Sequence, residues 1–168
     1  MRRSTLSTLA LALLAVRPAH AAAPQVTDAS GDTLPGYDIV SVLFAADAKA
    51  QRVTLTFAGA APDGDARYVV TTKTPTCDEV TLSFTSSDQA AVLDGCLPRQ
   101  TRVLAPAQRS GATVTFAVPR SALPSWWAAG TTLHGLAASV APNVAYPVGS
   151  TYPPVDLASS DKTYVLGS

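Results

Sequence analysis

The chain is poor in the residues that most enzyme and cofactor sites require. Among its 168 residues it has one methionine, two histidines and two cysteines. The methionine is Met1 and no G-x-S-x-G motif is present, so we expect neither a Met/His haem site nor a serine hydrolase. Carboxylate pairs at Asp63 and Asp65 and at Asp78 and Glu79 lie in turn-like contexts. We therefore expect that the chain is not an enzyme.

Charge is also scarce, because only 14% of the residues are Asp, Glu, Lys or Arg. No Lys/Arg cluster is present in the sequence, and this excludes nucleic acid and anionic lipid as main partners. Beyond residue 21 the chain carries nine basic and twelve acidic residues, a net charge of −3 with His neutral. Ala, Val, Thr, Pro and Gly are abundant instead, and this mixture favours strands and turns over long helices.

The N-terminus has the features of a secretory signal peptide. Two arginines precede an apolar core around residues 9–16, and a small-x-small ending follows at Ala19-His20-Ala21. The apolar core is too short to cross a bilayer, so we expect no membrane insertion. Residues 1–21 are predicted to be removed, and residues 22–168 to form one exported domain, extracellular or periplasmic, with a Pro-rich segment at 141–154.

Alternation of apolar and polar residues with period two predicts an all-β protein. With turn residues between the segments and no convincing amphipathic helix, we expect an antiparallel β-sandwich, jelly-roll or immunoglobulin-like, of about seven to nine strands. The expected strands span residues 39–45, 52–57, 67–72, 79–84, 90–93, 102–104, 112–118, 131–140 and 163–166.

Cys77 and Cys96 are the only cysteines. An even count in an exported chain favours a disulfide, because the compartment is oxidising. The bridge would close a loop of about twenty residues and stabilise the fold by about 3 kcal/mol on the chain-entropy model. Two free thiols that bind a metal or form a redox couple are the alternative, but the spacing is not C-x-x-C.

An acidic loop lies between residues 28 and 38 and leads into the first long strand. It carries Asp28, Asp32 and Asp38, separated by Gly31, Pro35 and Gly36. Carboxylates this close repel one another unless water or a cation screens them. The alternative is ordinary turn chemistry, in which Asp28 caps a turn, Asp32 is solvated and Asp38 begins a strand.

Two pairs of aromatic residues are candidates for a binding surface. Trp126 and Trp127 lie in a connection between two predicted strands, and Tyr146 and Tyr152 lie in the Pro-rich segment. Exposed rings stack on sugar faces or anchor protein interfaces. The alternative for the tryptophans is that one plugs the end of the core while the other covers a loop.

Two stretches carry a resemblance to a known family. D-A-S-G-D followed by P-G-Y-D-I-V-S-V, and T-V-T-F-A-V-P-R-S-A-L followed by T-T-L-H-G-L-A-A, resemble the secreted bacterial β-sandwich domains related to DOMON domains and family-nine carbohydrate-binding modules. The resemblance covers residues 28 to about 140.

The resemblance implies a non-catalytic module that binds carbohydrate or another cell-envelope polymer. It also implies a structural calcium ion beside the first strand, for which Asp28, Asp32 and Asp38 would supply oxygens, with a late acid such as Asp156 or Asp161 closing the shell. A protein-interaction or structural module, such as an accessory subunit or inhibitor of another secreted protein, is the alternative function.

Overall fold

The described part of this computed structural model comprises residues 23–34, 36–62, 66–85, 90–96, 103–142 and 156–167. The predicted signal peptide, Tyr146 and Tyr152, and the Pro-rich segment after Pro142 lie outside these ranges. The described residues form eleven strands. These are β1 (Val26–Thr27), β2 (Ile39–Ala46), β3 (Ala50–Phe57), β4 (Ala66–Thr74), β5 (Cys77–Thr85), β6 (Ala90–Gly95), β7 (Val103–Ser110), β8 (Thr113–Pro119), β9 (Thr132–Pro142), β10 (Asp156–Ser160) and β11 (Tyr164–Val165).

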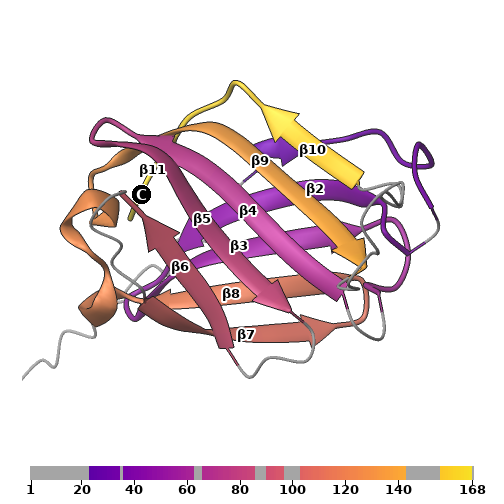
Figure 1. The fold of residues 1–168 in the computed structure, drawn as a ribbon, viewed down its shortest axis with the longest axis horizontal. Coiled ribbons are helices and arrows are strands. Elements are labelled where there is room, and N and C mark those ends of the chain that lie inside the picture. The colour runs from indigo at the N-terminus through magenta and orange to yellow at the C-terminus, as the bar shows by residue number, and fades with distance from the viewer. Residues whose placement is uncertain are drawn as a thin grey trace, which may run out of the picture.

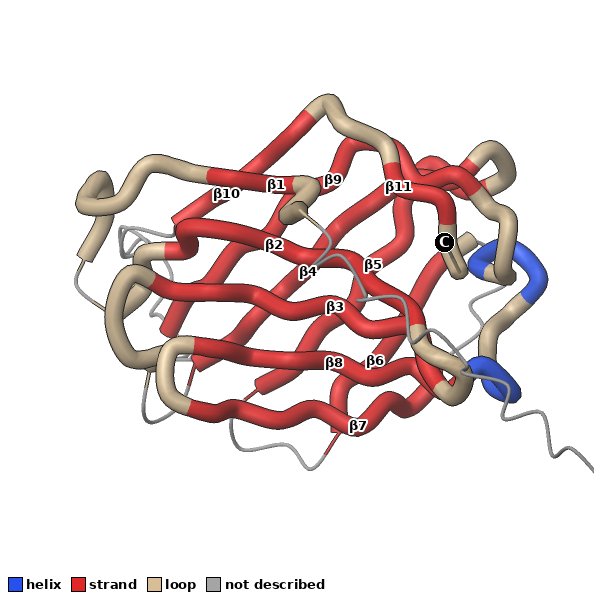
Figure 2. The backbone as a smooth tube through the Cα atoms, turned by 180° about the vertical axis from the view of Figure 1, so that it is seen from behind, coloured by secondary structure: helices blue, strands red, loops and turns tan. Residues whose placement is uncertain are grey.

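Ten of these strands follow one continuous antiparallel path, in the order β1-β2-β3-β8-β7-β6-β5-β4-β9-β10, while β11 pairs with β9. In Figure 1 the half that contains β6, β5, β4 and β9 lies in front of the half that contains β2, β3 and β8. The view from behind in Figure 2 reverses this order. The sheet therefore curls so that its two halves face each other, and the prediction of an antiparallel all-β fold is confirmed.

Alternation along each strand builds the core between the two halves. In β3, Val53, Leu55 and Phe57 point inward and are buried, while the threonines between them are half-buried on the outer face. Val53 lies opposite Phe116 of β8, which is also fully buried. Similar inward rows on the other half complete one hydrophobic cluster. The period-two pattern in the sequence therefore arises because alternate residues of each strand face this core.

Strand β7 carries the path from one half of the sheet to the other, and we call it the corner. Its first four residues, ending at Pro106, pair with β6, whereas Ala107 to Ser110 pair with β8. Pro106 is the last residue in register with β6 and Ala107 is the first in register with β8. The two halves are thus joined through a single unbroken strand.

The two ends of the path come together on the opposite side. Strand β10 lies beside β1 and β2, and we call this place the seam. The Ile39 amide of β2 donates a hydrogen bond of 2.5 Å to Oδ2 of Asp156, the first residue of β10. The sheet is therefore nearly closed and barrel-like.

The expected number of strands was too low. The sequence contains two short strands that alternation over so few residues does not reveal, β1 and β10, and a β7 that extends well past residue 104. These three strands form the corner and the seam, which turn the sheet into one nearly closed path. In the described ranges the helices η1 (Arg120–Ala122) and η2 (Ser125–Trp127) are too short to span a membrane.

Candidate metal centre at the seam

The acidic loop that joins β1 to β2 is folded by its own side chains. Gly31 has a φ of 90°, a left-handed conformation that glycine adopts without steric cost. Its amide donates a hydrogen bond of 2.5 Å to Oδ2 of Asp38. The amide of Asp28 donates to the carbonyl of Val40 at 3.1 Å. These contacts fold the loop back onto the start of β2, so that its carboxylates lie at the seam.

Asp156 reaches the same place from the far end of the chain. It is 5% exposed, and its register position in β10 is opposite Val140 of β9. Oδ2 accepts from the Ile39 amide, and Oδ1 accepts from the Leu157 amide at 3.0 Å. The Asp156 carboxylate therefore connects β10 to β2 directly.

Three carboxylates gather at the seam. Asp28, Asp32 and Asp156 each place one oxygen within 4.8 Å of the others. Asp28 is half-buried, Asp32 is exposed and Asp156 is buried, so the group leads from the surface into the fold. Calcium binds oxygen at about 2.3–2.6 Å, so two ligands on opposite sides of one ion are about 4.6–5.2 Å apart. Oxygens within 4.8 Å of one another can share such an ion.

The ionised form of Asp156 is electrostatically costly. Burial raises the pKa of Asp156 above its ordinary value, and the neighbouring carboxylates of Asp32 and Asp28 raise it further. The amides of Ile39 and Leu157 oppose this shift by donating to the charged form, but they do not cancel it. A bound cation would offset both burial and repulsion.

Two further oxygens of the acidic loop lack hydrogen-bond partners. Asp38 is 6% exposed, and although its Oδ2 accepts from Gly31, its buried Oδ1 has no hydrogen-bond partner among the described residues. The buried Oγ1 of Thr33 has none either. An unpaired buried carboxylate oxygen is costly, and a ligand that contacts these atoms would offset that cost. Asp38 was predicted as a ligand beside Asp28 and Asp32, but it lies outside the close group that Asp156 joins.

The predicted aromatic surface is not formed as one unit. Trp127 is 1% exposed and belongs to the core, so its ring presents no free face. Trp126 is half-buried and packs over Gly95, where a Cβ would approach its ring to 2.9 Å. Trp127 is thus placed as the alternative expects of one ring, in the core, whereas Trp126 lies over Gly95 of β6 rather than over a loop. The positions of Tyr146 and Tyr152 lie outside the described residues.

The predicted disulfide is confirmed. Cys77 at the start of β5 and Cys96 after β6 are joined, with Cα atoms 4.8 Å apart. A hollow of about 320 Å³ beside the bridge is lined by Asp78 and Glu79. Both carboxylates are exposed on the surface of the protein. The other pair, Asp63 and Asp65, lies outside the described ranges.

Comparisons of the chain with protein-family models, with curated proteins and with solved structures found no match. The site is therefore interpreted from its own residues and their chemistry.

Proposed function

We propose that the chain is an exported, non-catalytic binding module, a flattened β-sandwich whose seam is closed by one calcium ion. The observation that carries this proposal is the group of three carboxylates formed by Asp28, Asp32 and Asp156. The group joins a loop near the start of the domain to a strand near its end. A cation in this position acts on the fold rather than on a substrate.

Calcium fits this group better than other metals do. The group contains only oxygen donors, which exclude the thiolate and imidazole environments typical of zinc and copper. Calcium takes six to eight oxygens in flexible geometry, so backbone carbonyls and water complete a shell that three carboxylates begin. Magnesium demands shorter distances and near-ideal octahedral geometry. Oδ1 of Asp38 and Oγ1 of Thr33, which have no hydrogen-bond partner among the described residues, are further candidate ligands in the same loop.

The expected role of the ion is structural. A ligand that binds only the native state stabilises it by mass action, by about 2.7 kcal/mol at a concentration 100 times its Kd. Without calcium, repulsion among the carboxylates weakens the seam. With calcium, β10 is held against the β1–β2 loop, and the outer surfaces of the sheet keep their shape.

The binding partner that we propose is a carbohydrate or another cell-envelope polymer, in line with the resemblance to DOMON-related and family-nine carbohydrate-binding modules. A row of outward side chains supports the second candidate, binding to another secreted protein. The row crosses one half of the sheet in register and is uncharged, and its two end residues, Leu157 and Leu104, are 64% and 66% exposed. The row consists of Leu157, Ser139, Val69, Ser83, Val92 and Leu104.

Calorimetric titration of the oxidised protein with calcium chloride tests the proposal. We expect one bound ion per chain, and we expect Asp32→Asn to abolish the binding heat because Asp32 is a ligand. Asp161→Asn is the matched control, since Asp161 is an exposed acid of the C-terminal region that does not belong to the close group. Absence of binding to the parent protein, or equal loss in both variants, would contradict the calcium site.

A further inference from the structure

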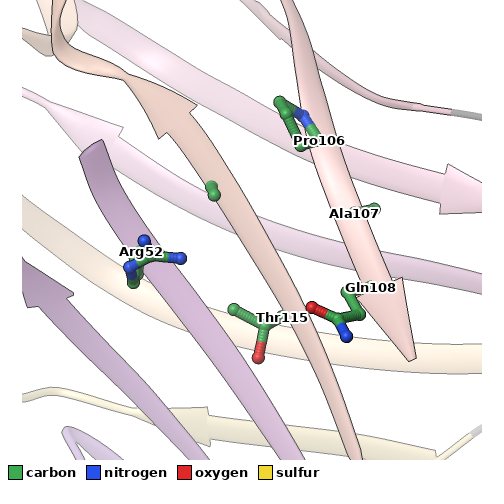
Figure 3. A pocket seen from close by; sticks show the side chains of 6 residues that line it. Arg52, Pro106, Ala107, Gln108 and Thr115 are labelled. Carbon is green, nitrogen blue, oxygen red and sulfur yellow. The ribbon is translucent and has the colours of Figure 1, made fainter. Parts of the chain in front are cut away.

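A groove of about 360 Å³ lies on the outer face of β3, β8 and β7, near the corner (Figure 3). Figure 3 shows side chains from β3, β8 and β7 that line it. This volume is at the lower end of the range for small-molecule sites, about 300–1,000 Å³. The lining residues are Arg52, Pro106, Ala107, Gln108, Thr115 and Ala117.

The path of β7 creates the groove. From Ala107 onward β7 pairs with β8, with Gln108 opposite Thr115. Before that point β7 pairs with β6 instead, so it leaves β8 beside Ala117. The small side chains of Ala107 and Ala117 do not fill the space that opens there, and Figure 3 shows Gln108 and Thr115 close together at one end.

Arg52 is held in place at the other side of the groove. Its Nε donates a hydrogen bond of 2.7 Å to Oδ2 of Asp47 in the β2–β3 turn. Oδ1 of Asp47 accepts from the amides of Lys49 at 2.7 Å and Ala50 at 2.8 Å. The pKa of Asp47 is lowered to about 2 by the amide of Lys49, the Arg52 side chain and the amide of Ala50. Asp47 therefore stays charged at neutral pH and keeps its hydrogen bond to Arg52. The hydrogen bond to Asp47 limits the rotamers of Arg52 and so lowers part of the entropy that binding would cost.

Donors and acceptors remain available in the groove. Among the described residues, neither Nη atom of Arg52 and neither polar atom of the Gln108 amide has a hydrogen-bond partner in the protein. Oγ1 of Thr115 lies 3.2 Å from Oγ1 of Thr54 and still has capacity for another bond. The groove therefore offers guanidinium donors, an amide with both polarities and a hydroxyl.

The charge balance of the groove indicates what it binds. Among the described lining residues Arg52 is the one charged side chain, and it is paired with Asp47, so the lining itself carries little net charge to attract an anion. The lining contains no aromatic ring and no long apolar side chain, so a hydrophobic ligand gains little burial there. Hydroxyl groups both donate and accept, and neighbouring hydroxyls on one ring match guanidinium, amide and threonine partners together.

We propose that this groove is a saccharide subsite that binds the hydroxyl groups of one neutral sugar ring of a polymer, with Arg52, Gln108 and Thr115 as the hydrogen-bonding residues. This inference rests on the proposed function as a polymer-binding module and gives its site and ligand class. It places sugar binding on the outer face of β3, β8 and β7 rather than at the tryptophans.

The test follows backbone amide signals of the ¹⁵N-labelled oxidised protein by NMR while single ligands are added. The neutral probes are methyl β-D-glucopyranoside and methyl β-D-galactopyranoside, and acetate is the anionic probe. We expect a neutral glycoside to shift the amides of Gln108, Thr115 and Ala117. Arg52→Gln and Gln108→Ala should each weaken the interaction roughly tenfold, since each removes a hydrogen bond.

Arg67→Gln is the matched control, because Arg67 is an exposed arginine on β4, in the other half of the sheet. It should leave the shifts unchanged, and melting curves should show that all three variants fold. Shifts with acetate alone would overturn the neutral-sugar assignment in favour of an anion subsite. An equal effect of Arg67→Gln would overturn the location.

Gel electrophoresis through laminarin, dextran and xylan separates this inference from the proposed function. Retardation that Arg52→Gln and Gln108→Ala remove supports the groove. Retardation that both variants retain would keep the polymer-binding module and overturn the groove. No retardation, together with no glycoside shifts, would overturn both the groove and the carbohydrate part of the proposed function. Calcium titration would still decide the seam independently.

Discussion

The two halves of the sheet meet at two places, and the chemistry at these places differs. At the corner, one continuous strand, β7, carries the path across, and the groove beside it is lined by an arginine, polar side chains and two alanines. At the seam, two segments far apart in sequence meet through Asp156 and Ile39, and three carboxylates gather there. The corner is held together by the covalent chain, whereas at the seam β10 and β2 are joined by the hydrogen bond from Ile39 to Asp156.

The pKa values of two aspartates, one near the corner and one at the seam, are shifted in opposite directions. Asp47, in the turn next to the corner groove, has donors on both oxygens, and its pKa is lowered to about 2. Asp156, at the seam, also accepts two amide hydrogen bonds, but burial and neighbouring carboxylates raise its pKa. Hydrogen-bond donors and Arg52 thus stabilise the charged form of Asp47, whereas burial and neighbouring carboxylates disfavour the charged form of Asp156.

The largest effect is expected at Asp156. Asp156→Ala leaves the buried Ile39 amide without an acceptor, so in EDTA the free energy of unfolding should fall by about 1–3 kcal/mol. Asp156→Asn keeps an oxygen for that amide and removes the repelling charge, so its loss in EDTA should be smaller. Neither variant should respond to calcium. Urea denaturation in EDTA and in calcium measures these differences, and a full calcium response in either variant would break the contrast between seam and corner.

A smaller effect is expected at the corner. Pro106→Ala should lower the free energy of unfolding by about 0.4–1 kcal/mol, because alanine leaves the unfolded chain with more conformational freedom. The loss should be the same in EDTA and in calcium, since β7 joins the two halves at the corner and contributes no residue to the proposed calcium site at the seam. Urea denaturation in both buffers checks this, and a loss that appears only in EDTA would show that the two junctions are coupled.

The smallest effect is expected at Asp47, because Asp47 and Arg52 are both exposed. The pKa of Asp47 is lower in the folded protein than its ordinary value of 3.8, so its contribution is present above that value and is lost as the pH falls through about 2. Asp47→Asn should therefore be less stable than the parent at pH 7, and the difference should shrink between pH 3.8 and about 2. Denaturation series at several pH values test this. A difference that does not change with pH would mean that the carboxylate charge is not responsible.

The long strands could be predicted because each has one buried and one outer face. Alternation placed β2, β3 and β8 within one or two residues of their observed bounds. β10 could not be predicted, because Asp-Leu-Ala-Ser-Ser is short and begins with a buried charge. β7 was underestimated because its last residues, around Gln108 and Arg109, are exposed and polar.

The candidate sites were predictable to different degrees. The acidic loop could be found from the spacing of Asp28 and Asp32, but the choice of Asp156 over Asp161 required knowing where β10 packs. Thr33 gave no signal, since a threonine in a turn is common. Arg52, Gln108 and Thr115 are ordinary outer residues of three strands, and only the path of β7 brings them around one groove.

Thermal unfolding of the oxidised protein in EDTA and in excess calcium tests the central claim, that a cation closes the seam, most directly. We expect calcium to raise the Tm of the parent protein and to leave the Tm of Asp32→Asn unchanged, because a ligand stabilises only the state that binds it. Superimposable melting curves of the parent protein in the two buffers would contradict the claim.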